Sequence, residues 1–486
     1  MKLKDILKGI ECRLQGPAEV EVKDLQFDSR KVTAGTLFVA QVGTKVDGHD
    51  FIARAVASGA VAVLCQRIPE GAPDGVTYIV VDNSDRALGE AAANYYGHPS
   101  RQLKLVGITG TNGKTTTVTL LHRMFRLAGN HAGLISTIVN KIDEEEIPTG
   151  HTTPDALELN RLLSRMVQAG CRFCFMEVSS HSVVQQRIAG LEFSGAIFSN
   201  ITHDHLDFHK TMANYIAAKK GFFDALPPSA WALTNVDDRN GRVMVQNTRA
   251  TVYTYGLNHL GDFHCKVLEE GFEGMHLNIN GNELWSRLVG RFNAYNLLAI
   301  YGAAVLSGIE PAEAVRLLTL LEPAPGRFQY VSGKGITAIV DYAHTPDALE
   351  NVIGTINDIR RKNQQLITVV GCGGDRDKTK RPEMAQIASK GSDKLVLTSD
   401  NPRSENPESI LDDMEAGLSP EQLCHTVRIT DRRQAIRTAC MMAREGDIIL
   451  IAGKGHEKYQ EVNGVRSHFD DVEEVENELR VKKFVF

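Results

Sequence analysis

The stretch that decides the fold is Gly107-Ile-Thr-Gly-Thr-Asn-Gly-Lys-Thr-Thr116, a glycine-rich turn that ends in a lysine and two threonines. The apolar run Leu103 to Ile108 leads into it and is typical of a buried strand. Beyond the turn, apolar residues recur at the spacing of one buried helix face, at Val118, Leu121, Met124 and Phe125. The stretch therefore predicts a strand, a glycine turn and a helix N-terminus in direct succession.

This combination favours a phosphate-binding site. Backbone N–H groups of such a turn point inward, the helix dipole favours negative charge, and Lys114 adds a point charge. Thr115 or Thr116 would supply a hydroxyl to Mg²⁺. The usual P-loop spacing is not met, because Ile108 takes the place of the first glycine and Gly107 lies one residue early. A strand–helix turn with glycines for close packing is the alternative, but Lys-Thr-Thr at the helix start favours a nucleotide-phosphate site of an unusual subtype.

Length and composition indicate an ordinary globular protein of several domains. A chain of 486 residues predicts about three domains at roughly 150 residues each. The net charge of −6 gives no sign of a nucleic-acid or membrane-surface partner. We find no signal peptide and no apolar run long enough for a membrane span, so we expect a cytoplasmic protein. Eight scattered cysteines do not form a disulfide framework, and Cys171 and Cys174 lie in a strand-like run as expected core thiols.

Two proline-rich and glycine-rich segments divide the chain. They are Tyr96-Gly-His-Pro-Ser100 and Glu322-Pro-Ala-Pro-Gly326. Strand-like runs alternate with helical patterns throughout, which predicts α/β domains with parallel sheets. We expect domains at 1–99, 100–326 and 327–486. The strands expected in the last domain are Ile336–Val340, Leu366–Val370, Lys394–Leu397 and Ile448–Ala452.

Three further segments carry candidate ligands. Glu177 follows the Cys171 strand, where a carboxylate at a strand's carboxyl end could bind Mg²⁺, although a solvated loop acid is the commoner case. The histidines at 203, 205 and 209 invite a zinc interpretation, but no cysteine or H-E-x-x-H pattern supports it. Spacing alone favours a solvated helix face for Lys219 and Lys220.

Taken together, these segments resemble the Mur ligases, the ATP-dependent amide ligases that build the peptidoglycan stem peptide. The resemblance covers essentially the whole chain, and the unusual glycine spacing is the family's own. The motifs that carry it occur in the family's order: Gly110-Thr-Asn-Gly-Lys-Thr115, Glu177-Val-Ser-Ser-His181, Asp204-His-Leu-Asp207, Tyr215-x-x-Ala-Lys219, Gly290-Arg-Phe-Asn-Ala-Tyr-Asn296 and Asp341-Tyr-Ala-His-Thr-Pro-Asp347.

The resemblance implies an α/β fold with a central P-loop-type ATPase domain between an N-terminal UDP-binding domain and a C-terminal Rossmann-like domain. It implies that Thr115 and Glu177 bind one Mg²⁺ and that His205 helps to bind a second. Lys219 matches a lysine that reacts with CO₂, and its carbamate would be an anionic oxygen ligand where an ammonium would repel Mg²⁺. Lys114, Glu177, His205 and Lys219 would be the catalytic set. ATP would contact Gly110, Thr111, Asn112, Gly113, Lys114, Thr115, Thr116, Asn296, Arg327 and Asp341.

The two ends of the chain resemble the third ligase of the series, which adds residue three. Phe27-Asp-Ser-Arg30 and Gly43-Thr-Lys-Val-Asp-Gly48 look like its uridine-binding edge. That assignment implies substrate contacts from Phe27, Ser29, Thr44, Lys45 and Val46. Further residues match positions that bind the muramoyl dipeptide: His151, Thr152, Thr153, Ser179, Gln185 and Arg187. Taken alone, each of these residues would be interpreted as an ordinary loop or helix-capping residue.

The C-terminal segments indicate the incoming amino acid. Asp400-Asn-Pro-Arg403 resembles the tetrapeptide of ligases that add meso-diaminopimelate rather than L-lysine. Diaminopimelate is lysine with an extra carboxylate, which an arginine fork binds bidentately. Losing two charge-assisted bonds of about 1.5–3 kcal/mol each would give a hundredfold discrimination or more. The resemblance places Arg376, Asp400, Asn401, Pro402, Arg403, Gly453 and Glu457 at this ligand.

The implied reaction joins meso-diaminopimelate to the D-glutamate side chain of UDP-N-acetylmuramoyl-L-alanyl-D-glutamate through an acyl phosphate. ATP, Mg²⁺ and the Lys219 carbamate would be the cofactors, and we expect a monomer. The lysine-adding form is the nearest alternative, and Arg403 argues against it. A folylpolyglutamate synthase-like ligase and an inactive nucleotide-binding scaffold are more distant alternatives. The first hundred residues argue against the former and the retained catalytic set against the latter.

Overall fold

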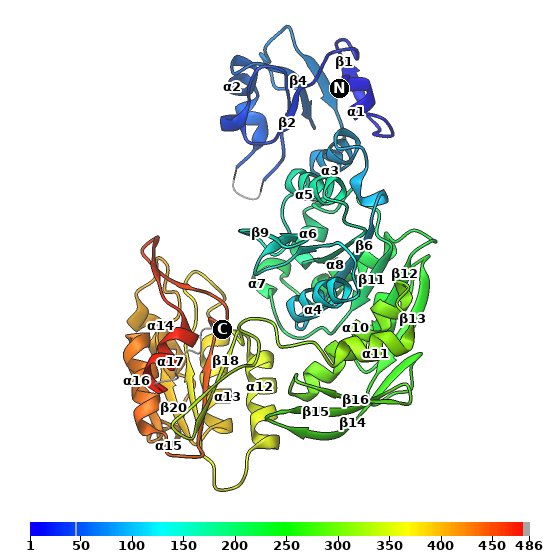
Figure 1. Cartoon of the computed structure of the whole chain (residues 1–486). Helices are drawn as coiled ribbons and strands as arrows, with labels where there is room; N and C mark the ends of the chain where they lie inside the picture. The colour runs from blue at the N-terminus through cyan, green and yellow to red at the C-terminus, as the bar shows by residue number, and fades with distance from the viewer. Residues whose placement is uncertain (44–45, 480–486) are drawn as a thin grey trace.

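The computed structural model describes residues 1–43 and 46–479 and contains three α/β units, each built on its own main sheet. In Figure 1 the units follow one another along the chain, from the blue N-terminal unit through the cyan and green central unit to the yellow and red C-terminal unit. The predicted α/β class is confirmed. The domain limits at 99/100 and 326/327 stay predictions. Within the described residues no helix has the length and apolar character of a membrane span.

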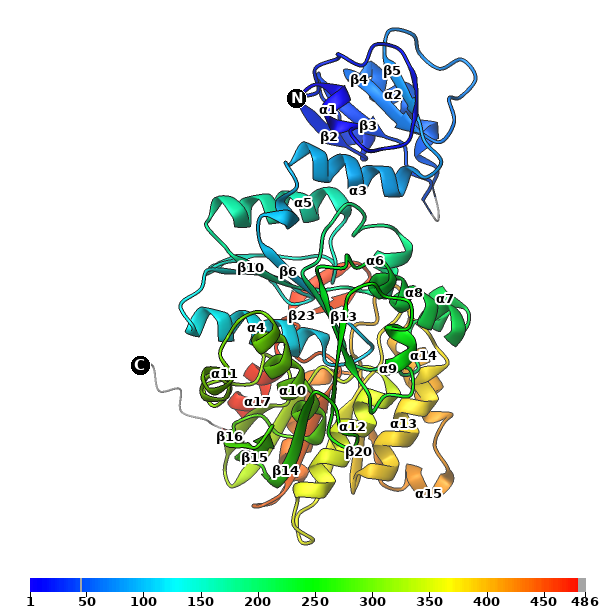
Figure 2. The ribbon, with the colours of Figure 1, turned by 90° about the vertical axis from the view of Figure 1, so that its right-hand side faces the viewer.

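The N-terminal unit has a five-stranded sheet in the order β1-β5-β4-β3-β2, in which only β1 is antiparallel to its neighbour. Helix α3 (Ser84–Tyr95) leaves this unit and lies against α5 (Ala156–Gln168) of the central unit (Figure 2). The junction is tight, since a Cβ atom on Gly89 would lie 2.5 Å from the Ala189 carbonyl oxygen. The other elements are α1 (Leu3–Ile6), β1 (Arg13–Gln15), β2 (Asp24–Gln26), η1 (Ser29–Lys31), β3 (Thr36–Val39), η2 (Gly48–Phe51), α2 (Ile52–Ala57), β4 (Ala60–Cys65) and β5 (Thr77–Val80).

The central sheet has eleven strands, and its parallel core runs β7-β10-β6-β11-β12-β13-β14. Antiparallel strands extend it at both ends. The strands are β6 (Lys104–Thr109), β7 (Ala132–Ile135), β8 (Asn140–Ile142), β9 (Glu145–Ile147), β10 (Phe173–Glu177), β11 (Gly195–Phe198), β12 (Trp231–Asn235), β13 (Thr251–Gly256), β14 (Phe263–Gly271), β15 (Gly274–Ile279) and β16 (Asn282–Ser286).

Helices cover both faces of this sheet because its strands are apolar on both sides. Val106 and Ile108 of β6 pack with α4 and α10, whereas Leu105 packs with α5 and α8. The predicted face of α4 is confirmed, since Val118, Leu121, Met124 and Phe125 are all buried. Cys171 and Cys174 are buried free thiols, as expected. The helices are α4 (Lys114–Leu127), α6 (Ser180–Val184), α7 (Leu206–His209), α8 (Met212–Asp224), α9 (Gly241–Met244), α10 (Arg291–Leu306) and α11 (Pro311–Leu318).

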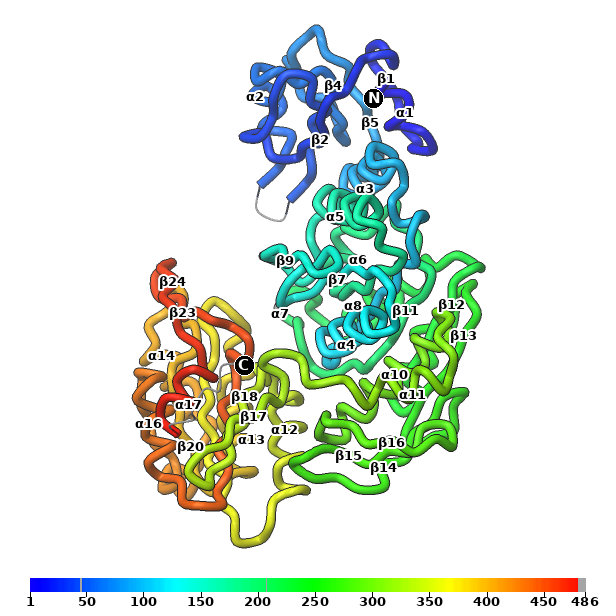
Figure 3. Tube along the Cα trace, viewed as in Figure 1, coloured from blue at the N-terminus to red at the C-terminus, as the bar shows by residue number. Residues whose placement is uncertain are grey.

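The C-terminal unit has a six-stranded sheet in the order β17-β18-β22-β19-β20-β21, parallel except at β17. All four predicted strands are present, as β18 (Ile336–Asp341), β19 (Leu366–Val370), β20 (Lys394–Leu397) and β22 (Ile448–Ala452). The remaining elements are β17 (Gln329–Gly333), α12 (Pro346–Ile359), α13 (Lys380–Gly391), α14 (Pro407–Glu415), α15 (Pro420–Leu423), β21 (Thr426–Arg428), α16 (Arg432–Met442) and α17 (Asp471–Leu479). Strands β23 (Tyr459–Val462) and β24 (Val465–His468) form a separate hairpin that stands apart from the sheet (Figure 3).

Candidate active site

The glycine turn joins β6 to α4, and the helix begins at Lys114 as the sequence predicts. Gly110 and Gly113 have φ values of 155° and 86°. A Cβ atom would strike the Ser199 hydroxyl at Gly110 and the Asn296 side chain at Gly113, so both positions require glycine. The Lys114 ammonium donates hydrogen bonds to the carbonyl oxygens of Gly110 (2.9 Å) and Thr111 (2.8 Å). The turn thus places a half-buried cation beside the helix N-terminus.

Glu177 ends β10, the strand next to β6, and lies at the same sheet edge as the glycine turn. Its Oε1 accepts a hydrogen bond of 2.8 Å from the Thr137 backbone N–H. Its Oε2 is buried and has no hydrogen-bond partner. Leaving a buried carboxylate oxygen unsatisfied is costly, so the site fits a cation that would complete its coordination. The Thr115 hydroxyl accepts a bond of 3.3 Å from Arg327 Nη2.

Lys219 lies inside the protein and not on a solvated helix face, so the interpretation from spacing alone was wrong. Its ammonium donates a hydrogen bond of 2.8 Å to the Gly110 carbonyl oxygen and lies 4.7 Å from the Tyr215 ring centroid. Burial, and then the charge of Lys114, lowers the pKa of Lys219 well below its ordinary value. The neighbouring Lys220 instead pairs with Asp224 at 2.6 Å.

His205 directly precedes α7 and has the left-handed φ of 54°. Its Nε2 lies 3.4 Å from Asp204 Oδ2, and its ring lies 4.9 Å from the His181 ring. Burial alone would raise the pKa of Asp204, but the surrounding histidines and lysines lower it. Among the side chains that the structure describes, no group of three or more His, Cys, Asp and Glu residues is arranged to hold a metal ion.

Loops after β19, β20 and β22 meet at the facing edge of the C-terminal sheet. The Gly374 N–H donates to the Asn401 carbonyl oxygen (2.9 Å), and Arg403 Nη1 donates to the Gly374 carbonyl oxygen (2.6 Å). Asn401 Nδ2 donates to Glu457 Oε2 at 2.7 Å. Arg403 has a φ of 52°, and its N–H donates to the Glu461 carbonyl oxygen of the β23–β24 hairpin (3.0 Å). Three segments far apart in sequence thus form one surface.

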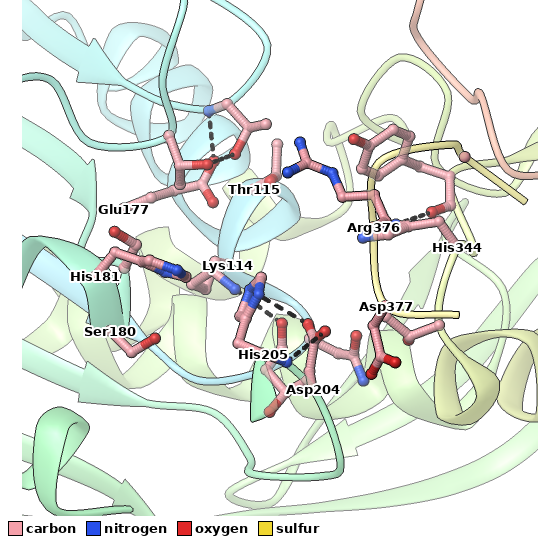
Figure 4. A pocket seen from close by; sticks show the side chains of 18 of the residues that line it. Lys114, Thr115, Glu177, Ser180, His181, Asp204, His205, His344, Arg376 and Asp377 are labelled. Carbon is pink, nitrogen blue, oxygen red and sulfur yellow. Dashed lines mark hydrogen bonds and ion pairs between the residues drawn. The ribbon is translucent and has the colours of Figure 1, made fainter. Parts of the chain in front are cut away.

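One cavity of about 450 Å³ connects the glycine turn with these loops. Figure 4 shows Glu177 and His181 on one side of it and Arg376 and Asp377 on the other, with His205 between them. The cavity brings together most of the residues predicted from the sequence: Thr111, Asn112, Gly113, Lys114, Thr115, Thr116, His151, Thr152, Thr153, Glu177, Ser179, Arg187, His205, Lys219, Arg327, Arg376, Asp400, Asn401, Arg403, Gly453 and Glu457.

A second cavity of about 350 Å³ adjoins the other side of the glycine turn. The predicted nucleotide residues Asn296, Arg327 and Asp341 line it, together with Asn112, Gly113 and Thr116. Asp341 Oδ2 accepts a bond of 2.7 Å from the Phe328 N–H, and burial raises the pKa of this carboxyl group. The central and C-terminal units also meet here, where Asn112 Nδ2 donates a hydrogen bond of 2.5 Å to Asp347 Oδ2.

Comparison with known proteins shows to which family this three-unit architecture belongs. Three family models match along the chain: "Mur ligase family, catalytic domain" at residues 21–96, "Mur ligase middle domain" at 108–304 and "Mur ligase, glutamate ligase domain" at 326–455. The chain belongs to the Mur ligase family. This Mur ligase is 56% identical over 475 residues to the UDP-N-acetylmuramoyl-L-alanyl-D-glutamate--2,6-diaminopimelate ligase of Phocaeicola vulgatus, covering 97% of this chain and 98% of that protein.

Other relatives agree with the family assignment. The chain is 54% identical to the protein of the same name from Bacteroides thetaiotaomicron, with 97% of this chain and 98% of that protein covered. A solved structure of a UDP-N-acetylmuramoyl-L-alanyl-D-glutamate--2,6-diaminopimelate ligase has a TM-score of 0.70 at 34% identity over 99% of both chains. A folylpolyglutamate synthase from Mycobacterium tuberculosis shares the fold with a TM-score of 0.60, but it is 16% identical and covers 75% of this Mur ligase.

Several residues predicted for the site line neither cavity. Phe27 packs against the N-terminal core, Ser29 is buried in η1, and Val46 is exposed. Thr44 and Lys45 lie outside the described residues. The carbonyl oxygens of Gly110 and Pro402 accept hydrogen bonds from Lys114 Nζ and the Glu405 N–H, respectively. Gln185 accepts a hydrogen bond of 2.6 Å from Arg187 Nη2, which brings it next to the first cavity.

The structure also shows contacts that the sequence reasoning did not select. The Thr137 N–H binds Glu177, and the Tyr215 hydroxyl lies 3.1 Å from the Thr111 hydroxyl. Asp237 lines the second cavity and accepts bonds from the Tyr295 hydroxyl and from three backbone N–H groups. Tyr295 and the cavity residues Tyr342 and His344 occur in motifs that the family resemblance highlights, so a signal existed for them. Thr137 and Asp237 act through pairings that no local pattern reveals.

Proposed function

We propose that this Mur ligase uses ATP to join meso-diaminopimelate to the D-glutamate side-chain carboxylate of UDP-N-acetylmuramoyl-L-alanyl-D-glutamate, a step of peptidoglycan synthesis. The observation that carries the proposal is the shared cavity, in which a phosphate-binding turn faces two arginines of the C-terminal loops. Near-full-length relatives named as this ligase support the same substrates. We also propose a cytoplasmic monomer with domains at 1–99, 100–326 and 327–486.

The reaction has two steps, and the two sides of the cavity suit one each. The D-glutamate carboxylate attacks the γ-phosphorus of ATP, which forms an acyl phosphate and releases ADP. The diaminopimelate amine then attacks the acyl carbon, and phosphate leaves as the amide forms and the amine loses a proton. Lys114 and the N–H groups of the turn offset the negative charge of the phosphates. The cavity aligns the acyl group with the amine, so the attack becomes effectively unimolecular.

Glu177, Thr115, His205 and Lys219 are proposed to bind the cations. The unpartnered Oε2 of Glu177 supports this role. Thr115 and Glu177 would hold one Mg²⁺, and His205 with a Lys219 carbamate would hold a second. Bound there, Mg²⁺ would supply positive charge against the phosphate oxygens. Lys219 suits carbamate formation because its lowered pKa favours the neutral amine, which adds to CO₂ and gives up one proton.

The remaining predicted contacts are part of the same proposal. Phe27, Ser29, Thr44, Lys45 and Val46 are assigned to the uridine end of the substrate. His151, Thr152, Thr153, Ser179, Gln185 and Arg187 are assigned to the muramoyl dipeptide. Thr153 and Arg187 are already joined, because Arg187 Nη1 donates to the Thr153 carbonyl oxygen at 2.6 Å.

An ADP-release assay tests the proposal directly. The purified chain is given ATP, Mg²⁺ and the UDP-muramoyl dipeptide, with either meso-diaminopimelate or L-lysine. We expect release that depends on diaminopimelate, with kcat/KM about a hundredfold or more above that for lysine. Equal turnover of the two amino acids would refute the specificity, and turnover of lysine alone would favour the lysine-adding alternative. No release with either would refute the activity.

A further inference from the structure

Lys454 is a fully buried cation directly behind the amino-acid side of the cavity. It lies in the turn after β22, between Gly453 and Gly455, whose φ values are 116° and 52°. A Cβ atom on Gly453 would lie 2.5 Å from Asp400 Oδ2, so the glycine allows the strand end to approach this acid. Lys454 does not line the cavity, whereas Asp400, Asn401 and Glu457 do. It can therefore act on a ligand only through these neighbours.

The Lys454 ammonium organises two of those neighbours. It donates to Asn401 Oδ1 at 3.0 Å and to Glu457 Oε2 at 3.3 Å, and it lies 3.9 Å from Asp400 Oδ1. Asn401 Nδ2 donates to the same Glu457 Oε2 at 2.7 Å. Two donors therefore fix this oxygen, while Glu457 Oε1 is approached by the Tyr342 hydroxyl at 3.5 Å.

The two carboxylates oppose each other electrostatically. Burial raises the pKa of Glu457, and the charge of Asp400 raises it further. Lys454 and the hydrogen bond from Asn401 act in the opposite direction. Lys454 bonds Glu457 directly. The other titratable or charged groups around the pair are Tyr342, Cys372, Arg403, Arg432, His456, Tyr459 and Arg466.

We propose that Lys454 is a positioning residue for the incoming amino acid, which keeps Glu457 ionised and aligned so that it can receive a substrate ammonium group. The inference rests on the proposed function, because it assumes that an amino acid enters between these loops. Without the Lys454 charge, Glu457 would lie beside the buried Asp400 carboxylate with no cation bonded to it, and it would take up a proton. An ammonium could then bind only after that proton had left.

The test compares Lys454→Met with Lys458→Met, the same substitution four residues away in a surface ion pair with Asp470 (3.6 Å). Both variants and the parent are assayed by ADP release from about pH 6 to 9. For Lys454→Met we expect the KM for meso-diaminopimelate to rise about tenfold or more, with the KM for ATP within about twofold. The acid limb of kcat/KM for diaminopimelate should move upward by about one pH unit. Lys458→Met should match the parent.

If Lys454→Met does not fold, a double variant still allows the proposal to be tested. Lys454→Met/Glu457→Gln removes both charges, so no unpaired carboxylate remains at position 457. We expect it to fold and to lose the acid limb, while Lys454→Arg retains the limb. A limb that persists in the double variant, or an unmoved limb in a folded Lys454→Met, would overturn the role of Lys454. A parent that releases no ADP with diaminopimelate would instead overturn the proposed function, and this inference with it.

Discussion

The glycine turn and the amino-acid site both lie at the carboxyl ends of parallel strands, but they are constructed differently. The turn is one continuous segment, 107–116, and its shape comes from glycine conformations and backbone N–H groups. The amino-acid site is assembled from loops after three strands and a hairpin, and side chains join those loops. In the first region the backbone of one segment sets the shape of the site, whereas in the second several side chains are needed to hold separate loops together.

This difference predicts separate effects of mutation. Changes near the turn should remove phosphoryl transfer for every amino acid. Changes in the C-terminal loops should affect the choice and affinity of the amino acid and leave the use of ATP intact. Substitutions in each region, taken in order of expected effect, can break this distinction.

The largest effect is expected for Lys219→Ala. Removing the group that would carry the carbamate should lower kcat by about 10²–10³-fold or more, because an anionic cation ligand is lost. Short-chain carboxylates added to the assay should restore part of the activity by taking the place of the missing group. Lys220→Ala is the control, since Lys220 pairs with Asp224 and does not line the cavity. Full activity of Lys219→Ala without added carboxylate would end the carbamate proposal.

The same difference explains what the sequence could predict. The strand, turn and helix from Leu103 to Phe125 follow from local periodicity and contiguous glycines, and the structure has them where expected. The environment of Lys219 could not be read in this way, because the Gly110 carbonyl that covers it lies 109 residues away. Spacing on a helix shows which residues share a face, but it does not show what packs on that face.

Arg403 shows a second limit. Its tetrapeptide points to diaminopimelate only through resemblance to a family, since the four residues alone describe a plain turn. Its left-handed φ and its backbone hydrogen bonds to the β23–β24 hairpin depend on strands that lie much later in the sequence. The N-terminal predictions Phe27, Ser29 and Val46 remain untested for a related reason, because they line neither cavity.

Arg403→Met should give the next largest effect, on specificity. We expect the ratio of kcat/KM for diaminopimelate to that for lysine to fall about a hundredfold, because the fork for the distal carboxylate is lost. The KM for ATP should stay within about twofold of the parent. Parallel ADP-release assays with the two amino acids give both quantities, with Arg437→Met on the exposed side of α16 as the control. An unchanged ratio would show that a residue other than Arg403 determines the choice of amino acid.

A smaller effect is expected for Glu405→Gln, which alters only the support of the loops. Glu405 accepts bonds from Arg381 Nη2 (2.8 Å) and from the Asp375 N–H (2.6 Å), and the Arg381 side chain is fully buried. Weakening this pair should loosen the loop that carries Arg376. We expect the KM for diaminopimelate to rise about tenfold, with kcat and the KM for ATP little changed.

Glu408→Gln is the matched control, because Glu408 pairs with Arg428 at the surface and does not line the cavity. A fall in ATP-dependent steps in Glu405→Gln, with diaminopimelate binding intact, would contradict the separation of the two regions.

The smallest effect concerns stability in acid. The hydrogen bond from Arg381 lowers the pKa of Glu405 to about 2, below the ordinary value near 4.5 for a glutamate. A group with a lowered folded-state pKa stabilises the protein above its unfolded-state pKa, and this contribution is lost as the pH falls from there toward about 2. At neutral pH, Glu405→Gln should therefore melt about 2–4 °C below the parent.

The difference in melting temperature should shrink as the pH falls below about 4.5, since the parent loses the same interaction. Other acids with lowered pKa values, such as Asp28 and Asp47, are present in both proteins and cancel in the difference. Thermal melts of the two proteins at matched pH measure the gap, and a gap that stays constant down to about pH 3 would show that the Glu405 charge does not support these loops.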